Sequence, residues 1–98
     1  MKAESLTNLV KDAGISLNAA SLLAALVRTE LAETVEYPST TGSGEVKSFV
    51  RLTETGLSYG LNKPTMHEFK TDPRFFAETF PELLHVVHLQ IGREINSL

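Results

Sequence analysis

The stretch LTETGLSYGLN, residues 52–62, follows a run of β-branched and aromatic residues and abruptly changes the character of the chain. Thr53 is a favourable N-terminal cap for a helix, and Glu54 would place negative charge where the helix dipole favours it. Leu57 and Leu61 are four residues apart and would share one helical face. The stretch therefore predicts a short third helix that starts directly after a strand.

Two glycines interrupt this predicted helix, although glycine destabilises a helix interior by about 1 kcal/mol relative to alanine. We expect Gly56 to permit close packing in the first turn, and Gly60 to end the helix. The stretch is thus predicted to be a structural joint and not a reactive site.

Two helices are predicted before this joint. From Ser5 to Ala13 the apolar residues recur every three or four positions, and Gly14 is well placed to stop the helix. The following run is rich in strong helix formers, with Ser16 or Asn18 as its N-terminal cap. The tight link between the two helices suits a helix-turn-helix, although any helical hairpin would show the same spacing.

A β-hairpin is predicted between the second helix and the joint. Residues 34–37 and 46–52 are rich in β-branched and aromatic side chains, which favours two strands. Pro38, Gly42 and Gly44 lie between them among serines and threonines, so we expect a long, polar tip.

The C-terminal third is predicted to be an extended crossing segment, residues 62–73, followed by a long helix. Prolines bias their preceding residues away from helix. The last helix is expected to start with Thr71 or Asp72 as its cap and Pro73 in its first turn, and Pro81 should kink or restart it. Three phenylalanines are expected to fill the core beneath the hairpin and the third helix: Phe75, Phe76 and Phe80. The apolar stripe of the last helix comprises Leu83, Leu84, Val87, Ile91, Ile95 and Leu98.

The order helix, helix, hairpin, helix is that expected of a winged helix, so the predicted fold is α+β and winged-helix-like, with a long amphipathic C-terminal helix. We expect a single domain over residues 1–98. Residues 1–61 would supply the helix-turn-helix, the wing and the third helix. Residues 62–98 would supply the crossing segment and the C-terminal helix.

The Leu-Thr-Glu-x-Gly run directly after the second predicted strand resembles winged-helix modules of bacterial and phage regulators. The longer pattern GSGEVKSFVRLTETGLSYGLN, which leads into PRFFAETFPELL, is similar to small modules of phage and prophage proteins, including antirepressor-like ones; it spans residues 42–84. This resemblance implies a wing over about residues 34–52 and a recognition helix over about residues 17–29. Only the run from Leu52 to Gly60 carries over residue by residue, and its role there is structural.

Composition limits the classes of function. The chain has 98 residues, of which 42% are hydrophobic and 21% charged, as expected for one globular domain. Nine basic and twelve acidic residues give a net charge of −3, which excludes a polycationic nucleic-acid binder. The absence of cysteine excludes disulfides, thiolate zinc sites and cysteine nucleophiles.

The N-terminus, MKAESLTNLV, lacks the apolar core of a signal peptide, and no stretch approaches the roughly 20 apolar residues that span a bilayer. We therefore expect a complete cytoplasmic protein without membrane contact.

Candidate DNA-contacting residues lie on the predicted outward face of the second helix and on the hairpin. On the helix, small residues would allow close approach to a groove, and Asn and Arg pair well with base edges. Basic residues elsewhere could contact phosphates, although Glu33, Glu36 and Glu45 on the same hairpin oppose this. The alternative is an ordinary solvated helix face. The helix candidates are Asn18, Ser21, Ala25 and Arg28, and the phosphate candidates are Lys11, Lys47 and Arg51.

Val86 and Leu89 lie away from the main apolar stripe of the last helix, and we expect them to form a homodimer or partner interface. Isolated exposed apolar residues are the alternative explanation. His85 and His88 have a spacing that could hold a metal with Glu82 or His67, but no complete ligand set is evident and no metal site is expected.

No enzyme constellation is present, and no cofactor is expected. The first hypothesis, and the one that we predict, is a phage- or prophage-type transcriptional regulator that binds DNA through the second helix and the wing. The second is a protein-interaction module on the same scaffold that does not bind DNA. The net acidity favours the second, whereas the helix order and the resemblance favour the first.

Overall fold

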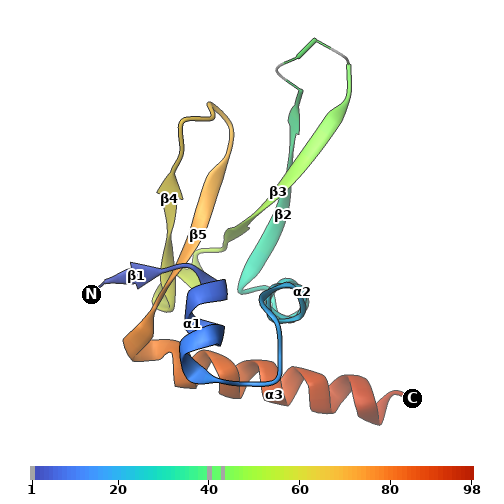
Figure 1. The fold of residues 1–98 in the computed structure, drawn as a ribbon. Helices are drawn as coiled ribbons and strands as arrows, with labels where there is room; N and C mark the ends of the chain where they lie inside the picture. Colours follow the sequence, from blue (N-terminus) through green and yellow to red (C-terminus); the bar gives the residue numbers. More distant parts are fainter. Residues whose placement is uncertain (1, 40, 43) are drawn as a thin grey trace.

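The computed structural model describes residues 2–39, 41–42 and 44–98, and over these residues the fold is mixed α+β (Figure 1). Three α-helices accompany two small antiparallel sheets. The elements in chain order are β1 (Ala3–Glu4), α1 (Leu6–Ala13), α2 (Ala19–Arg28), β2 (Ala32–Pro38), β3 (Val46–Leu52), η1 (Thr55–Ser58), β4 (Gly60–Pro64), β5 (Thr71–Phe76), η2 (Ala77–Thr79) and α3 (Phe80–Asn96). Thr40 and Ser43, which belong to the predicted polar hairpin tip, lie outside the described residues.

The first two helices form where the sequence predicts them, because both have favourable caps. The Ser5 hydroxyl accepts a hydrogen bond from the Asn8 backbone N–H at 3.2 Å, and Gly14 ends α1 with a φ of 65°, which glycine adopts without strain. At the start of α2, Asn18 Oδ1 accepts from the Ser21 N–H at 2.8 Å, so Asn18 and not Ser16 is the cap.

The predicted hairpin is confirmed and extends further than expected. Strands β2 and β3 pair in antiparallel register from Ala32 opposite Leu52 to Pro38 opposite Val46. The base of this hairpin is buried and its outer half is largely exposed, consistent with Figure 1, where the hairpin projects away from the helices.

The prediction of a third helix after the first hairpin is wrong. After Leu52 the chain makes one 3-10 turn, Thr55–Ser58, and then enters β4 at Gly60. The residue that precedes this turn is Glu54 and not the predicted Thr53, although the Thr53 hydroxyl accepts a hydrogen bond from the Gly56 N–H at 3.2 Å. Gly60 does not end a helix; it starts a strand. Local helix propensity is overridden because this segment pairs with β5 instead of continuing the turn.

The two glycines of the joint are required for close packing, which confirms the expectation for Gly56. A Cβ built on Gly56 would overlap the carbonyl oxygen of Leu31, and one on Gly60 would overlap the carbonyl oxygen of Arg74. Both positions therefore bring one backbone segment against another at a separation that only glycine permits.

The predicted crossing segment is a second β-hairpin. Strands β4 and β5 pair from Gly60 opposite Phe75 to Pro64 opposite Thr71, and β1 pairs with the far side of β5 at Phe75 and Phe76. The strand order is β1-β5-β4. Pro73 lies in the central strand but beyond the two residues paired with β1, so its missing N–H removes no hydrogen bond to that strand. Because proline is unfavourable inside a central strand, Pro73 prevents the sequence pattern from predicting β5.

The last helix starts at Phe80 and not at Pro73, because residues 71–76 belong to β5. Pro81 stands in the first turn, so α3 begins where the sequence predicts a kink or a restart of a helix already formed. Only part of the apolar stripe of α3 is buried within the chain. Leu83 and Val87 are buried, whereas Ile95 is 60% exposed.

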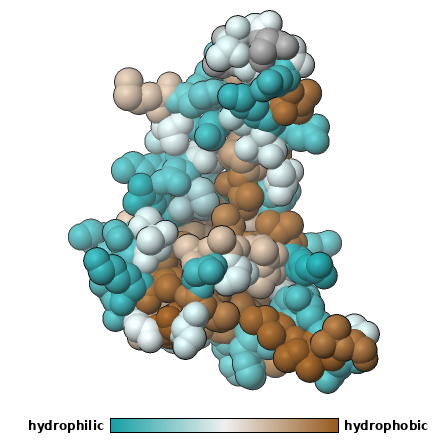
Figure 2. Space-filling view, turned by 45° about the vertical axis from the view of Figure 1, so that its right-hand side comes forward, coloured by the Kyte–Doolittle hydropathy of each residue, from teal (hydrophilic) through white to brown (hydrophobic). Residues whose placement is uncertain are grey.

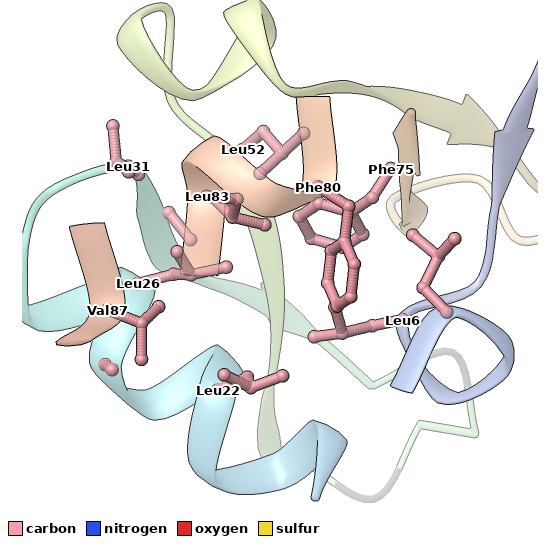
Figure 3. Close-up of a cluster of buried hydrophobic side chains, with 12 residues drawn as sticks. Leu6, Leu22, Leu26, Leu31, Leu52, Phe75, Phe80, Leu83 and Val87 are labelled. Atoms are coloured by element: carbon pink, nitrogen blue, oxygen red, sulfur yellow. The ribbon is translucent and has the colours of Figure 1, made fainter. Parts of the chain in front are cut away.

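One hydrophobic core joins the first two helices and the first hairpin to β5 and the last helix. Buried side chains from α1, α2, β3, β5 and α3 meet in it, and Phe75 and Leu26 are fully inaccessible (Figure 3). Phe75 and Phe80 are core residues as predicted, and Phe76 is partly buried. The two hairpins rise side by side from this helical base, with α3 along its opposite side (Figure 1).

Gly56→Ala is expected to destabilise the protein by about 1–3 kcal/mol, since the new methyl group would force the joint away from the Leu31 carbonyl. The matched control is Gly92→Ala in α3, where no atom lies within 4 Å of the new Cβ. There, alanine should stabilise the protein by about 0.5–1 kcal/mol at concentrations low enough to exclude self-association. Urea unfolding measures the free energy of unfolding of both variants. Equal free energies of unfolding in Gly56→Ala and Gly92→Ala would contradict the close packing of Gly56 against the Leu31 carbonyl.

Candidate interaction groove

An apolar groove runs along the outward face of α2, where the helix passes the β2–β3 hairpin. The groove encloses about 470 Å³. Ala20 and Ala24 are exposed on the helix side, and Val50 contributes from the hairpin side. Among the described residues that line it, only Arg28 is charged. The full lining comprises Ala20, Leu23, Ala24, Val27, Arg28, Thr34 and Val50.

A second hollow of about 380 Å³ continues this groove toward the other hairpin. The two hollows share Ala20, Leu23 and Val50 and therefore adjoin each other. At its far end the lining becomes more polar, with Lys70 and Asp72 from the second hairpin. The groove is therefore bounded by α2 on one side and by the β2–β3 hairpin on the other, and the more polar second hollow lies beside it.

The outward face of α2 is rotated relative to the sequence prediction. The pattern predicts Ala25 to face outward, but this residue is only 5% exposed and packs in the core beside Leu22 and Leu26. The helix is amphipathic about a centre near Leu26, and this leaves Leu23 and Val27 only partly buried at the groove. Ser21 is exposed as predicted, and its hydroxyl donates to the Asn18 carbonyl at 3.0 Å.

The basic candidates do not converge on one surface. Arg51 forms an ion pair with Glu33 across the hairpin, with Nε and Oε1 2.7 Å apart. Lys47 is exposed opposite Tyr37. Side chains alternate along a strand, so Lys47 and Arg51 lie on the face of the hairpin opposite to Val50 and the groove. Lys11 is exposed on α1.

The two interface candidates on α3 have different surroundings. Val86 is partly buried against the core, whereas Leu89 is 48% exposed. Figure 2 shows further apolar surface along the C-terminal end of α3, at the lower right, where Ile95 and Leu98 are exposed.

The histidines do not assemble a ligand set. The rings of His85 and His88 stack at 6.4 Å between centroids, and His67 lies on the turn of the second hairpin. Within the part of the chain that the structure describes, no group of three His, Cys, Asp or Glu residues could hold a metal.

An aromatic cluster that the sequence does not predict connects the two hairpins. The ring of Tyr37 in β2 lies 5.1 Å from His67 and 6.2 Å from Phe69, both on the turn between β4 and β5. Phe49 of β3 also contacts Tyr37, at 5.8 Å. The signal for this cluster is weak in the sequence, because its members come from separate hairpins and the second hairpin is itself not predicted. The groove has a clearer signal: Ala20, Leu23, Ala24 and Val27 repeat at helical spacing.

Comparisons with protein-family models, with curated proteins and with solved structures find no match to this chain. Among the described residues, no helix is both long enough and apolar enough to cross a bilayer. Function is therefore inferred from the surfaces of the molecule.

Asn18→Ala is expected to lower the free energy of unfolding by about 1 kcal/mol, because it removes the cap of α2. Ser16→Ala is the control, since Ser16 is the other candidate cap, and it should change stability by less than about 0.5 kcal/mol. Thermal or urea unfolding measures both. Equal losses in the two variants would show that Asn18 is not the cap.

Proposed function

We propose that this protein is a protein-interaction module that binds a partner through the apolar groove of α2. The observation that carries the proposal is the lining of the groove, in which a single charged side chain stands among alanine, leucine, valine and threonine in the described part of the chain. Apolar grooves of this kind bind the apolar face of a partner helix. Interfaces with DNA are instead polar and strongly positive.

The expected occupant is an amphipathic helix with an acidic residue at its edge. Ala20 and Ala24 are small, so a partner backbone can approach α2 closely, and Leu23, Val27 and Val50 provide apolar contacts. The cation at the end of the groove is Arg28, and no ion pair engages it within the described residues. A carboxylate of the partner placed there would form a charge-assisted hydrogen bond.

The scaffold is proposed to be winged-helix-like, with α1 and α2 as the helical pair and the β2–β3 hairpin as the wing. Two features support this: the order helix, helix, hairpin, and the packing of α3 against α2, where a supporting helix is needed. If the resemblance to phage and prophage modules expected from residues 42–84 holds, the partner would be a regulatory protein such as a repressor.

DNA binding is the second candidate function. It is favoured by the exposed Ser21 and by Arg28 on α2 and by the exposed Lys47 on the wing. Against it stand the apolar groove, the net charge of −3 and the placement of Lys47 and Arg51 on the opposite face of the hairpin. The protein-interaction function is therefore the better supported of the two.

Selection from a display library of helical peptides is expected to enrich sequences with apolar residues at i, i+3, i+4 and i+7 and a flanking Asp or Glu. Binding of a selected peptide should weaken about tenfold or more in Ala24→Arg, which fills the groove with a charge. Val46→Arg is the control, because Val46 is 66% exposed on the hairpin and lies outside the groove.

DNA binding, the competing function, is measured by fluorescence anisotropy with mixed-sequence duplex DNA at low salt. Salt-dependent DNA binding that is lost in both Arg28→Ala and Lys47→Ala, together with no peptide enrichment, would overturn the protein-interaction proposal in favour of DNA binding.

We also propose that α3 mediates self-association through its outer face, defined as His85, Leu89, Gly92 and Asn96. These residues recur at helical spacing and include no Asp, Glu, Lys or Arg, so the face carries no permanent charge that would repel a second copy. A Cβ added to Gly92 would meet no atom within 4 Å, so no contact inside the described part of the chain requires glycine there. A second helix could approach closely at this point.

Leu89→Glu is expected to shift the sedimentation mass from dimer to monomer, because the charge would be buried at the contact of two helices. Met66→Glu is the matched control, since Met66 is also apolar and is fully exposed on the second hairpin. A mass that is unchanged in Leu89→Glu would remove this face as an interface.

A further inference from the structure

The chain has four arginines, and they fall into two pairs with different surroundings. Arg51 and Arg74 each form an ion pair, with Glu33 and Asp72, at 2.7 Å. Arg28 and Arg93 have no ion pair among the described residues. Although Arg28 and Arg93 are far apart in the sequence, both line the same pocket.

This pocket lies where α2 ends, between η1 and α3, and encloses about 470 Å³. Four further residues of the lining carry hydroxyl groups, Thr29, Thr55, Ser58 and Tyr59. The Thr29 hydroxyl donates to the Leu26 carbonyl at 3.0 Å, whereas the other three hydroxyls make no hydrogen bond within the described part of the chain. Arg93 is held on one side, since its Nη1 donates to Gln90 Oε1 at 3.4 Å. The pocket thus gathers hydrogen-bond donors from three elements.

We propose that this pocket binds a phosphate monoester group. Two guanidinium groups match the double negative charge of such a group, and arginine is well suited to bidentate contact with phosphate oxygens. The hydroxyls could donate to the remaining oxygens; a planar carboxylate, with only two oxygens, could not satisfy as many donors. Among the described residues of the lining, only Glu30 is acidic, so positive charge still exceeds negative charge there.

Arg28 and Arg93 each lie in the last turn of a helix, where a cation interacts favourably with the helix dipole. The helix dipole alone would therefore account for a basic residue at each position. That explanation does not require the two side chains to share a pocket or hydroxyl groups to surround them. The phosphate site shares Arg28 with the groove, whereas Arg93, Thr55, Ser58 and Tyr59 line the pocket and not the groove.

The test is an NMR titration of the labelled full chain with inorganic phosphate and with O-phosphoserine, at constant ionic strength. Saturable shifts are expected at the amides of Thr55, Ser58 and Arg28 with both ligands. A response to inorganic phosphate alone would identify the free ion as the ligand, and a stronger response to O-phosphoserine would identify a phosphorylated side chain. Acetate and dimethyl phosphate, which carry one negative charge, should bind at least about tenfold more weakly.

Arg93→Gln and Arg28→Gln should each weaken phosphate binding about tenfold, whereas Arg51→Gln should change it less than about twofold. Arg51 is the control because it is an arginine outside the pocket that is already paired with Glu33. Circular dichroism spectra identical to wild type confirm that each variant is folded. Shifts that do not saturate, that are equally large with acetate, or that persist in both pocket variants would overturn the proposal.

Discussion

The close approach of backbone segments at Gly56 and Gly60 is the constraint on which the rest of the structure depends. Gly56 brings the turn after β3 against the Leu31 carbonyl at the exit of α2, and Gly60 brings β4 against the Arg74 carbonyl of β5. The Asn62 side chain adds two hydrogen bonds to the Leu52 backbone, accepting from its N–H at 2.8 Å and donating to its carbonyl at 3.0 Å. Helix α2 and both sheets are thereby fixed to one point.

This joint determines which surfaces remain free. It places the two hairpins side by side, where the Tyr37, His67 and Phe69 rings connect them, and it directs β3 past the outward face of α2. The inner face of α2 is covered by α3 and the core, so its second apolar row, Ala20, Leu23, Ala24 and Val27, is left at the groove. A helix that is apolar on two sides and covered on only one side is suited to bind a partner.

The distribution of charge supports the same conclusion. Half of the arginines are neutralised by ion pairs with neighbouring carboxylates, and the exposed lysines are dispersed over the N-terminus, α1 and both hairpins. Exposed ion pairs of this kind contribute little to stability, about 0–1 kcal/mol, but they reduce the positive field available to attract a polyanion. Within the described residues, Arg28 and Arg93 share one pocket without an ion pair, and this favours a small anion over an extended nucleic-acid backbone.

The sequence by itself determined the elements whose signals are local. The caps of α1 and α2, the strands of the first hairpin and the place of Pro81 in the first turn of α3 all follow from residues within a few positions of one another. The need for glycine at position 56 does not, because the Leu31 carbonyl that requires it comes from a distant segment. Tertiary structure decided the rest. Residues 60–76 formed a hairpin because β4 and β5 pair across a turn, and pairing energy outweighs the weak helical and proline signals of each segment alone. Tertiary structure also set the rotation of α2, which buried Ala25, because only contacts between distant segments fix which side of a helix meets the core. The pairing of β2 with β3 likewise left Lys47 and Arg51 on a different face from the groove.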